Sequence, residues 1–228
     1  MHRIMDNKLP TENQIVNFRD KLLKWFVNNK RAYPWRETDD PFKVLIAEIM
    51  LRRTKADQVE DVYNKLFSEY PDIIDLVNAD DEQLEQIIYP LGLKWRSPTF
   101  KMVAKEILAR HDGKVPNTRE LLLLLPGIGE YVAGAVLSIA YNHQEWLVDS
   151  NVVRLFKRYF GISTSKEGRR DKHVIELAKT YVSCDKPREA NLAILDFSAV
   201  VCTPKNPDCS NCHLSPDCRY YHYNDVHL

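Results

Sequence analysis

The sequence predicts an all-α protein, because apolar residues recur at helical spacing through most of its 228 residues. No stretch alternates apolar and polar residues over the length of a convincing strand, and no tandem repeat or low-complexity linker interrupts the chain. A chain of this length buries the core of one large domain or of two small ones. We therefore expect helices joined by short turns.

The first expected helix spans residues 11–29 and begins with a capping-box pattern, Thr11-x-x-Gln14. A second helix begins at Asp40 and Pro41, with the aspartate as cap and the proline in the first turn. The remaining periodic segments predict further helices near residues 55–69, 82–88, 99–110, 118–124, 130–141, 150–160, 171–183 and 188–200.

Four of the five cysteines lie near the end of the chain in the pattern C-x6-C-x2-C-x5-C, as Cys202, Cys209, Cys212 and Cys218. Their segment is short and rich in Pro, Asp and Asn, so we expect an inorganic group to order it. Four thiolates suit a tetrahedral zinc ion or a [4Fe–4S] cluster. The spacing favours the cluster, because structural zinc sites usually contain two tight cysteine pairs. Two disulfides are a further alternative, which requires an oxidising compartment. The fifth cysteine, Cys184, lies outside the motif and is expected to be structural.

The first ten residues contain no apolar stretch typical of a signal peptide, and no apolar run is long enough to cross a bilayer. We therefore expect a soluble, cytoplasmic protein. The net charge is zero and gives no indication of nucleic-acid binding. The charges are unevenly distributed, however: residues 70–90 carry six acidic and no basic side chains, whereas residues 154–172 carry seven basic and two acidic ones. Either a polyanion-binding face or ordinary solvated helix faces fit this pattern.

The segment 121–141 contains three of the seven glycines within eight residues. Pro126 ends one helix, Gly127 and Gly129 allow positive φ and close backbone approach, and a new helix follows at once. The N–H groups of this turn, around Ile128, and the following helix N-terminus suit a phosphate oxygen. Such a hairpin binds a nucleic-acid backbone without reading its sequence. A plain helix–helix corner is the alternative.

The order of three motifs in this chain resembles their order in the helix-hairpin-helix DNA glycosylases of the endonuclease III superfamily. These motifs are LPGIG at 125–129, VDSN at 148–151 and the four-cysteine segment at 202–218. The resemblance extends over nearly the whole chain, from about Phe18 to Tyr221. In that family the cysteine loop holds a [4Fe–4S] cluster, so the resemblance implies the same cofactor here.

The resemblance also implies two helical domains. The first is a six-helix domain at 31–141 that contains the helix-hairpin-helix. The second combines residues 1–30 with residues 142–228 and includes the cluster loop. The DNA-binding cleft is expected between them.

By the same resemblance, Asp149 is the catalytic aspartate. A carboxylate there stabilises the oxocarbenium character that develops on the sugar as the N-glycosidic bond breaks, and it orients the attacking water. The position also suits a helix N-cap. Asn151 matches a supporting residue of the adenine-removing branch, with a structural role at the helix start as the alternative.

Glu48 lies within an apolar helix, where a charge is expensive unless it is used or paired. We expect a buried acid with a raised pKa that protonates or hydrogen-bonds the departing base. The resembling adenine and thymine mismatch branches carry a glutamate at this place. A solvated outer face is the alternative.

In the bifunctional members of the resembling family, a lysine two residues after the second hairpin glycine forms a Schiff base with the sugar and permits strand cleavage. This chain has Tyr131 there. A phenol cannot form that imine, so we expect a monofunctional enzyme that leaves the strand uncut. Tyr131 is expected to line the pocket for the flipped base.

Two branches of the superfamily resemble this chain. Adenine glycosylases read MLQQT where it has Met50-Leu51-Arg52-Arg53-Thr54, and they carry a further C-terminal domain, whereas this chain ends ten residues after Cys218. The G:T mismatch thymine glycosylases read LLRRT and share the DFSA stretch found here at 196–199.

Arg52 and Arg53 are expected to wedge into the gap left by the flipped nucleotide or to contact the widowed guanine, with phosphate contacts alone as the alternative. Residues 94–99 depart from both branches, which leaves the substrate range open.

The sequence therefore predicts a glycosylase that removes thymine or uracil opposite guanine. An adenine glycosylase without its recognition domain is one alternative. A non-catalytic DNA-binding module is another, against which the presence of both Asp149 and Glu48 argues. The expected partner is double-stranded DNA that contains a mismatch or a damaged base, bound by a monomer in the cytoplasm of a prokaryote, at the nucleoid and not at a membrane.

Overall fold

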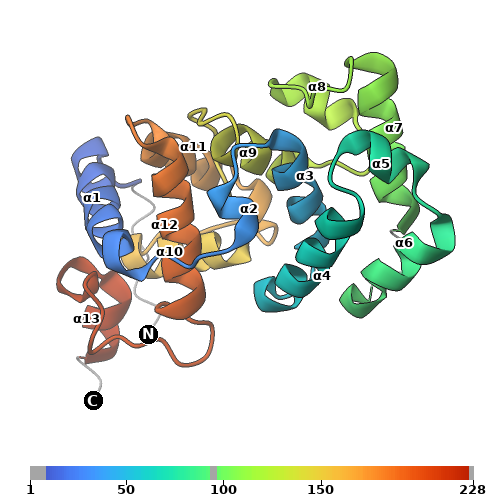
Figure 1. The fold of residues 1–228 in the computed structure, drawn as a ribbon. Helices are drawn as coiled ribbons and strands as arrows, with labels where there is room; N and C mark the ends of the chain where they lie inside the picture. Colours follow the sequence, from blue (N-terminus) through green and yellow to red (C-terminus); the bar gives the residue numbers. More distant parts are fainter. Residues whose placement is uncertain (1–8, 93–96, 226–228) are drawn as a thin grey trace. The chain divides into compact units, whose positions relative to one another are not determined.

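The computed structural model describes residues 9–92 and 97–225, with the side chains of residues 224 and 225 excepted. Every regular element in these ranges is helical, as Figure 1 shows, which confirms the all-α prediction. Within the same ranges, no helix is both long and apolar enough to cross a membrane. Most of the stretch examined for a signal peptide, and residues 94–96 of the segment that departs from the family pattern, lie outside the described ranges.

The chain divides into two compact units. One combines Met1–Arg31 with Asn142–Leu228, and the other is Ala32–Tyr141.

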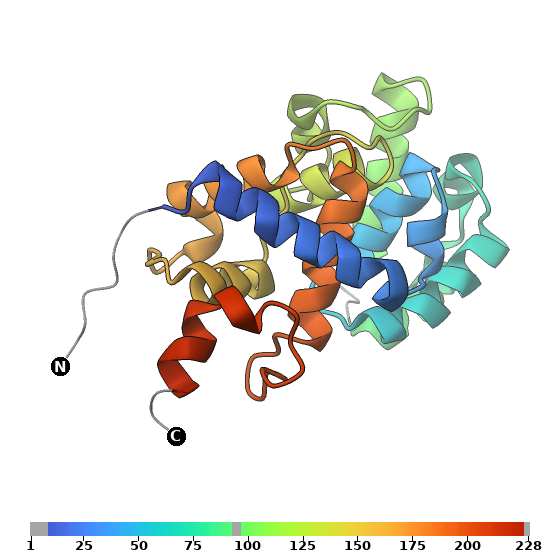
Figure 2. The same ribbon diagram turned by 90° about the vertical axis from the view of Figure 1, so that its left-hand side faces the viewer.

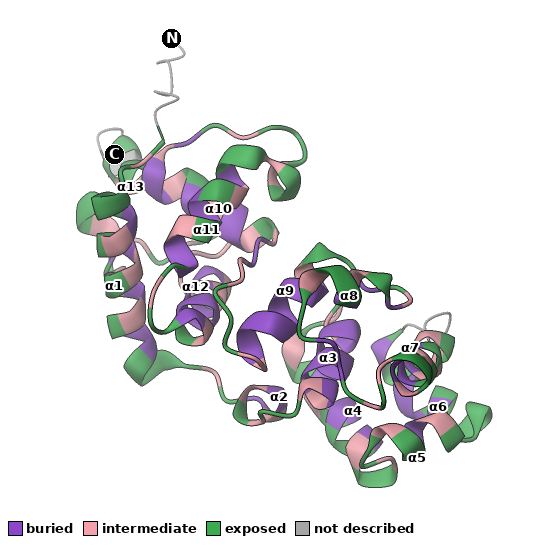
Figure 3. Ribbon diagram, turned by 90° about the horizontal axis from the view of Figure 1, so that it is seen from above, coloured by how far each residue is buried: buried purple, intermediate pink, exposed green. Residues whose placement is uncertain are grey.

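The unit at 32–141 is built around two apolar helices, α3 (Pro41–Met50) and α9 (Glu130–Ile139), which pack against each other. Eight residues of each helix are buried, and Figure 3 shows both largely in purple. The helices around them are α2 (Pro34–Glu37), α4 (Ala56–Glu69), α5 (Ile73–Asn78), α6 (Asp81–Ile88), η1 (Tyr89–Leu91), α7 (Ser97–Arg110) and α8 (Arg119–Leu124). The central pair carries Glu48 and Tyr131, so rigid elements hold both side chains.

In the other unit, α1 (Glu12–Asn29) packs along α12 (Pro187–Val200) and α11 (Lys172–Val182), as Figure 2 shows for the first pair. The helix α10 (Ser150–Phe160) packs against α12 and α13 (Arg219–Asp225). Two short 3₁₀ helices, η3 (Gly168–Arg170) and η4 (Ser215–Asp217), lie in the connections.

An aromatic cluster joins α1, α10 and α11 within this unit. The ring of Phe18 lies 4.6 Å from that of Tyr159, 5.1 Å from that of Phe160 and 5.7 Å from that of Tyr181, measured between centroids. Buried aromatic pairs at such distances add to the free energy gained from burying apolar surface. The cluster therefore fixes α10, the helix that carries Asp149 at its start.

The predicted caps are present. Thr11 and Gln14 form both bonds of the capping box, and the Asp40 carboxylate accepts hydrogen bonds from the N–H groups of Phe42 and Lys43 in the first turn of α3. The short helices α2, α5 and α13 were not expected. They have four, six and seven residues, so each offers few positions at which a helical period can show, although α8, also of six residues, was predicted.

Candidate active site and cysteine loop

Glu48 is buried in the middle of α3, with 5% of its surface exposed. Among the described residues it accepts no hydrogen bond. Burial raises its pKa to about 7, and the positive charge of Arg36 opposes the shift. The alternative of a solvated outer face is therefore wrong, and a buried carboxyl group with a raised pKa is typical of a functional site.

The helix-hairpin-helix runs from α8 through residues 125–129 into α9. The expectation of positive φ holds for Gly127, at 73°, but not for Gly129, at −117°. Gly129 is the N-cap of α9 and supplies no side-chain acceptor to the first N–H groups of that helix. A Cβ atom at Gly129 would meet nothing within 4 Å, so the backbone is open to a close ligand.

Ile128 lies between the two glycines, and its side chain is buried, with 8% exposed. It anchors the turn, and its N–H donates to the carbonyl of Leu125 over 3.2 Å. Pro126 follows the end of α8 and is half-buried. The phosphate contact predicted for the N–H groups of this turn stays a prediction, and the N–H of Ile128 is already used within the turn.

The two arginines after α3 differ in their surroundings. Arg52 Nη1 donates to the carbonyl oxygen of Gly127 over 2.9 Å and so links the end of α3 to the hairpin turn. Arg53 is exposed and has a φ of 66°, the left-handed region that L side chains rarely adopt. The adjacent Thr54 hydroxyl is buried without a hydrogen-bond partner among the described residues. The DNA contacts predicted for both arginines stay predictions.

Tyr131 is the second residue of α9 and is half-buried. It follows directly on the hairpin turn, and its helix packs against the helix of Glu48. The phenol predicted to line a base pocket therefore comes from the same compact unit as Glu48 and the hairpin, whereas Asp149 belongs to the other unit.

Asp149 is the N-cap of α10, as its position in the sequence allowed. Its Oδ1 accepts hydrogen bonds from the backbone N–H groups of Asn151 (2.8 Å) and Val152 (2.7 Å). Its Oδ2 accepts a third from the side-chain amide of Asn151, over 3.0 Å. Asn151 thus has a structural role at the helix start and also holds the carboxylate in one orientation.

A hydrogen-bonded chain connects this carboxylate to the cysteine loop. Arg154 Nη1 donates to Asn151 Oδ1 over 2.7 Å. Its Nε and Nη2 donate to the carbonyl oxygen of Cys202 over 3.1 and 2.8 Å, and Nη2 also donates to that of Ser198 over 2.7 Å. Arg154 therefore bridges the start of α10, the end of α12 and the first cysteine.

One turn further along α10, Arg158 also turns to the cysteine loop. Its Nη1 lies 3.4 Å from Cys202 Sγ and donates to the carbonyl of Thr203 over 2.7 Å, and its Nη2 donates to that of Pro204 over 2.9 Å. The guanidinium stacks over the ring of Tyr220, 4.7 Å from its centroid. Two of the seven basic residues at 154–172 thus serve internal contacts and are unavailable to a polyanion.

These contacts were missed in the sequence, where both arginines counted as surface charge. A signal was present, because Asn151, Arg154 and Arg158 are spaced i, i+3 and i+7 and so share one face of a helix. What that face meets is decided only by the path of the cysteine loop.

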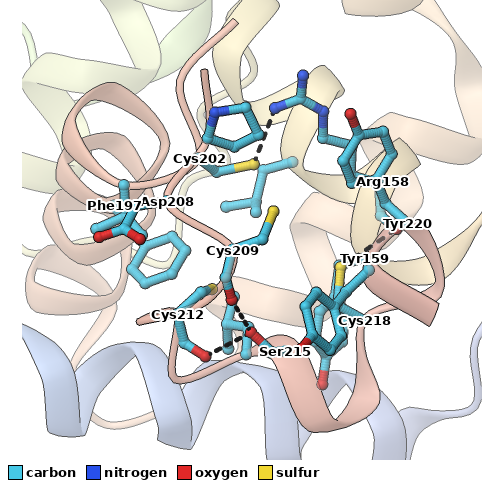
Figure 4. A pocket seen from close by; sticks show the side chains of 15 residues that line it. Arg158, Tyr159, Phe197, Cys202, Asp208, Cys209, Cys212, Ser215, Cys218 and Tyr220 are labelled. Carbon is cyan, nitrogen blue, oxygen red and sulfur yellow. Dashed lines mark hydrogen bonds between the residues drawn. The ribbon is translucent and has the colours of Figure 1, made fainter. Parts of the chain in front are cut away.

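The four cysteines of the C-terminal motif line one pocket, shown in Figure 4, together with apolar residues such as Leu155 and Phe197. All five cysteines of the chain are free, so the two-disulfide alternative is not observed. Within the described residues, no group of three or more His, Cys, Asp or Glu side chains is arranged to hold a metal ion.

Ser215 makes polar contacts within the cysteine loop. Ser215 Oγ lies within hydrogen-bond distance of the carbonyl oxygens of Cys209 (2.5 Å) and Cys212 (2.8 Å), contacts drawn in Figure 4. Burial raises the pKa of the Cys209, Cys212 and Cys218 thiols. Four thiols in one pocket, with an arginine beside the first, fit a thiolate-bound group by their type and number.

The chain is similar to known proteins along most of its length. Residues 46–193 match the sequence pattern of HhH-GPD, the superfamily of base excision DNA repair proteins. The thymine/uracil-DNA glycosylase of Methanothermobacter thermautotrophicus is 37% identical over 90% of this chain and 93% of its own. That of Pyrobaculum aerophilum is 36% identical over 93% of this chain and 95% of its own. The adenine DNA glycosylase of Mus musculus is 33% identical over 91% of this chain, but over only 42% of its own length.

Solved structures agree with this relationship. A thermostable thymine-DNA glycosylase, 36% identical, superposes with a TM-score of 0.87 over 92% of this chain and 98% of its own. A trapped endonuclease III–DNA covalent intermediate, 26% identical, superposes with a TM-score of 0.79 over 95% of this chain and 100% of its own. The resemblance inferred from the three motifs is thereby confirmed: the chain belongs to the HhH-GPD superfamily of base excision DNA repair proteins.

Proposed function

We propose that this protein is a monofunctional DNA N-glycosylase that removes thymine or uracil mispaired with guanine. The observation that carries the proposal is its similarity to two thymine/uracil-DNA glycosylases along nearly the full length of both chains. The similarity to adenine DNA glycosylases covers less than half of the mouse protein, which makes adenine removal the weaker alternative.

Asp149 acts on the sugar in this proposal. Breaking the N-glycosidic bond builds positive charge at the deoxyribose, and a nearby carboxylate lowers the free energy of that transition state. Three hydrogen bonds, two from backbone and one from Asn151, hold the carboxylate in place before the substrate arrives. An acceptor fixed in this way needs no reorganisation during the reaction.

Glu48 acts on the departing base. With a pKa of about 7, a substantial fraction of its carboxyl groups is protonated near neutral pH. A protonated carboxyl donates a hydrogen bond or a proton to the base as the base leaves with negative charge. The buried position keeps competing water away from this group.

Tyr131 decides what happens after the base has left. It occupies the place of the lysine that forms a Schiff base in bifunctional relatives, and its phenol cannot attack the sugar in that way. The product is therefore an abasic site in an intact strand. In this proposal the half-buried ring stacks against the extruded base.

The four cysteines would hold a [4Fe–4S] cluster. When bound, the cluster cross-links the loop at 202–218 through four thiolates. Arg154 and Arg158 bind the carbonyl oxygens of this loop, so an ordered loop also supports the start of α10. Iron and sulfide analysis, with an absorption spectrum, distinguishes the cluster from zinc.

The substrate is proposed to be double-stranded DNA with a mismatched base, bound by a monomer through the hairpin and the arginines at 52 and 53. The proposed location is the cytoplasm of a prokaryotic cell, where thiols stay reduced.

One assay tests the function. Labelled duplexes that contain G:T, G:U, A:8-oxoguanine or A:G are incubated with the protein and then treated with alkali, which cleaves abasic sites. We expect cleavage of the G:T and G:U duplexes, and only after alkali. Cleavage confined to the adenine duplexes would replace the proposal by its alternative, and binding without turnover on all four would reduce the protein to a DNA-binding module.

A further inference from the structure

Glu130 brings a negative charge to the place where the hairpin is proposed to bind a DNA phosphate. It is the first residue of α9, directly after the N-cap Gly129, and 59% of its side chain is exposed. A carboxylate stabilises the N-terminus of its own helix, but it repels an anionic ligand at the same terminus. The Glu130 carboxylate therefore weakens phosphate binding at this turn unless a cation offsets its charge.

Arg119 is the cation that does so. It is the first residue of α8, the other helix of the hairpin. Its Nη1 donates both to the Glu130 carboxylate, over 2.7 Å, and to the Glu130 carbonyl oxygen, over 3.1 Å. Only 15% of the Arg119 side chain is exposed, so the guanidinium is held against the protein and does not swing in solvent.

The two contacts have different consequences. The bond to the carboxylate offsets its charge, and the bond to the carbonyl fixes the first turn of α9 relative to α8. Arg52 binds the Gly127 carbonyl from the end of α3, so a second arginine holds the turn at its other end. The N–H groups of the turn are thereby kept in one arrangement.

We propose that Arg119 is a positioning residue of the DNA-binding hairpin, which neutralises Glu130 and fixes the start of α9 so that the turn accepts a phosphate. This inference rests on the proposed function, because it assumes that the ligand is duplex DNA. Its specific content is that Arg119 supports DNA binding through Glu130.

The test is a double-mutant cycle in the Asp149→Asn background, in which binding to a G:U duplex is measured without turnover. Arg119→Ala should weaken binding about tenfold at low salt, because an uncompensated carboxylate then faces the phosphate. Adding Glu130→Gln should restore affinity to within about threefold, since the repelling charge is gone. The deficit of Arg119→Ala alone should shrink as salt is raised, because salt screens exposed charges.

Lys101 provides a matched control in the same unit. It is 16% exposed, and its Nζ donates to the Asp81 carboxylate and to the Ala79 carbonyl, each over 2.6 Å. Lys101→Ala removes the same charge and the same kind of contact, but it should change DNA affinity less than twofold. An equal loss in both variants would mean that net charge alone matters, which overturns the inference.

Arg119→Lys covers the case in which the alanine variant does not fold. It keeps the charge and should bind DNA within about threefold of the parent, whereas Arg119→Gln should bind as weakly as alanine. Additive effects of Arg119→Ala and Glu130→Gln would reject the inference and leave the proposed function intact. Failure of the Asp149→Asn parent to bind any duplex would instead contradict the proposed function itself.

Discussion

The side-chain amide of Asn151 donates to the second oxygen of Asp149 over 3.0 Å, while its own oxygen accepts from Arg154 over 2.7 Å. Asn151 therefore orients the proposed catalytic carboxylate. Asn151 is in turn oriented by Arg154, which also binds the carbonyl oxygen of Cys202 at the start of the cysteine loop. An asparagine whose amide oxygen faces an arginine must turn its NH₂ group the other way, toward the carboxylate. This arrangement ties the geometry of the first turn of α10 to the integrity of the loop at 202–218.

Replacing the carboxylate tests its role directly. Asp149→Asn should abolish base removal from a G:U duplex, because an amide carries no charge to stabilise the sugar cation. DNA affinity should stay within a few fold, since asparagine also caps helices. Single-turnover kinetics and a binding titration on the same preparation measure the two effects. Unchanged turnover would remove Asp149 from the mechanism.

The link through Arg154 predicts an effect on rate. Arg154→Lys should lower the single-turnover rate about tenfold, because a lysine cannot bind Asn151 and the Cys202 carbonyl together. The affinity for DNA should change little. Lys157→Ala, on the exposed face of the same helix, is the control and should keep the full rate. A rate equal to that of the parent protein in Arg154→Lys would contradict the positioning role.

Glu48 predicts a dependence of activity on pH. Because its protonated form acts on the base, the rate should fall as pH rises above about 7, the pKa of the buried group. Glu48→Gln should lower the rate at every pH and remove this fall. A pH profile of single-turnover rates for both proteins measures it, and a fall that persists in Glu48→Gln would assign the titration to another group.

The same group predicts a dependence of stability on pH. Its pKa rises from 4.5 to about 7 on folding, so between these values the folded state binds more protons than the unfolded state. The free energy of unfolding should therefore fall by about 3 kcal/mol as pH rises through this window. Denaturant titrations at pH 5 and pH 8 should show a smaller fall for Glu48→Gln. An equal fall in both proteins would exclude Glu48 as its source.

Tyr131 predicts a gain of function. Tyr131→Lys should form a Schiff base with the abasic sugar, which borohydride reduces to a stable covalent complex with DNA, and it should cut the strand without alkali. Tyr131→Phe should do neither. Gel analysis of borohydride-treated reactions separates the variants. Trapping by the wild-type protein would show that another amine reaches the sugar.

The cysteine motif predicts which thiols bind iron. Cys212→Ser should lose iron and the visible absorption of the purified protein, because serine replaces a thiolate ligand. Cys184→Ser should keep both, since Cys184 lies outside the four-cysteine pocket. Iron analysis and a visible spectrum of the two variants make the comparison. Zinc in place of iron in the wild-type protein would overturn the proposed cofactor.

Several features of this protein were determined by its sequence alone. The helical period of long segments, the caps at Thr11, Asp40 and Asp149 and the glycine at position 127 act over a few residues, and the structure contains each of them. The order of hairpin, aspartate and cysteines identified the superfamily, because each motif is a local pattern with fixed spacing. Some short helices such as α5 escaped detection, since six residues carry little periodicity, whereas α8, of the same length, was predicted.

Only the tertiary structure decided which polar side chains are buried and what they meet. Glu48 has the same neighbours in sequence whether its helix face lies in the core or in solvent, and packing against α9 is needed to bury that helix. Arg119 and Glu130 are eleven residues apart, and Arg154 and Cys202 are forty-eight apart. Such contacts arise from chain folding over long separations, which no local pattern of residues encodes.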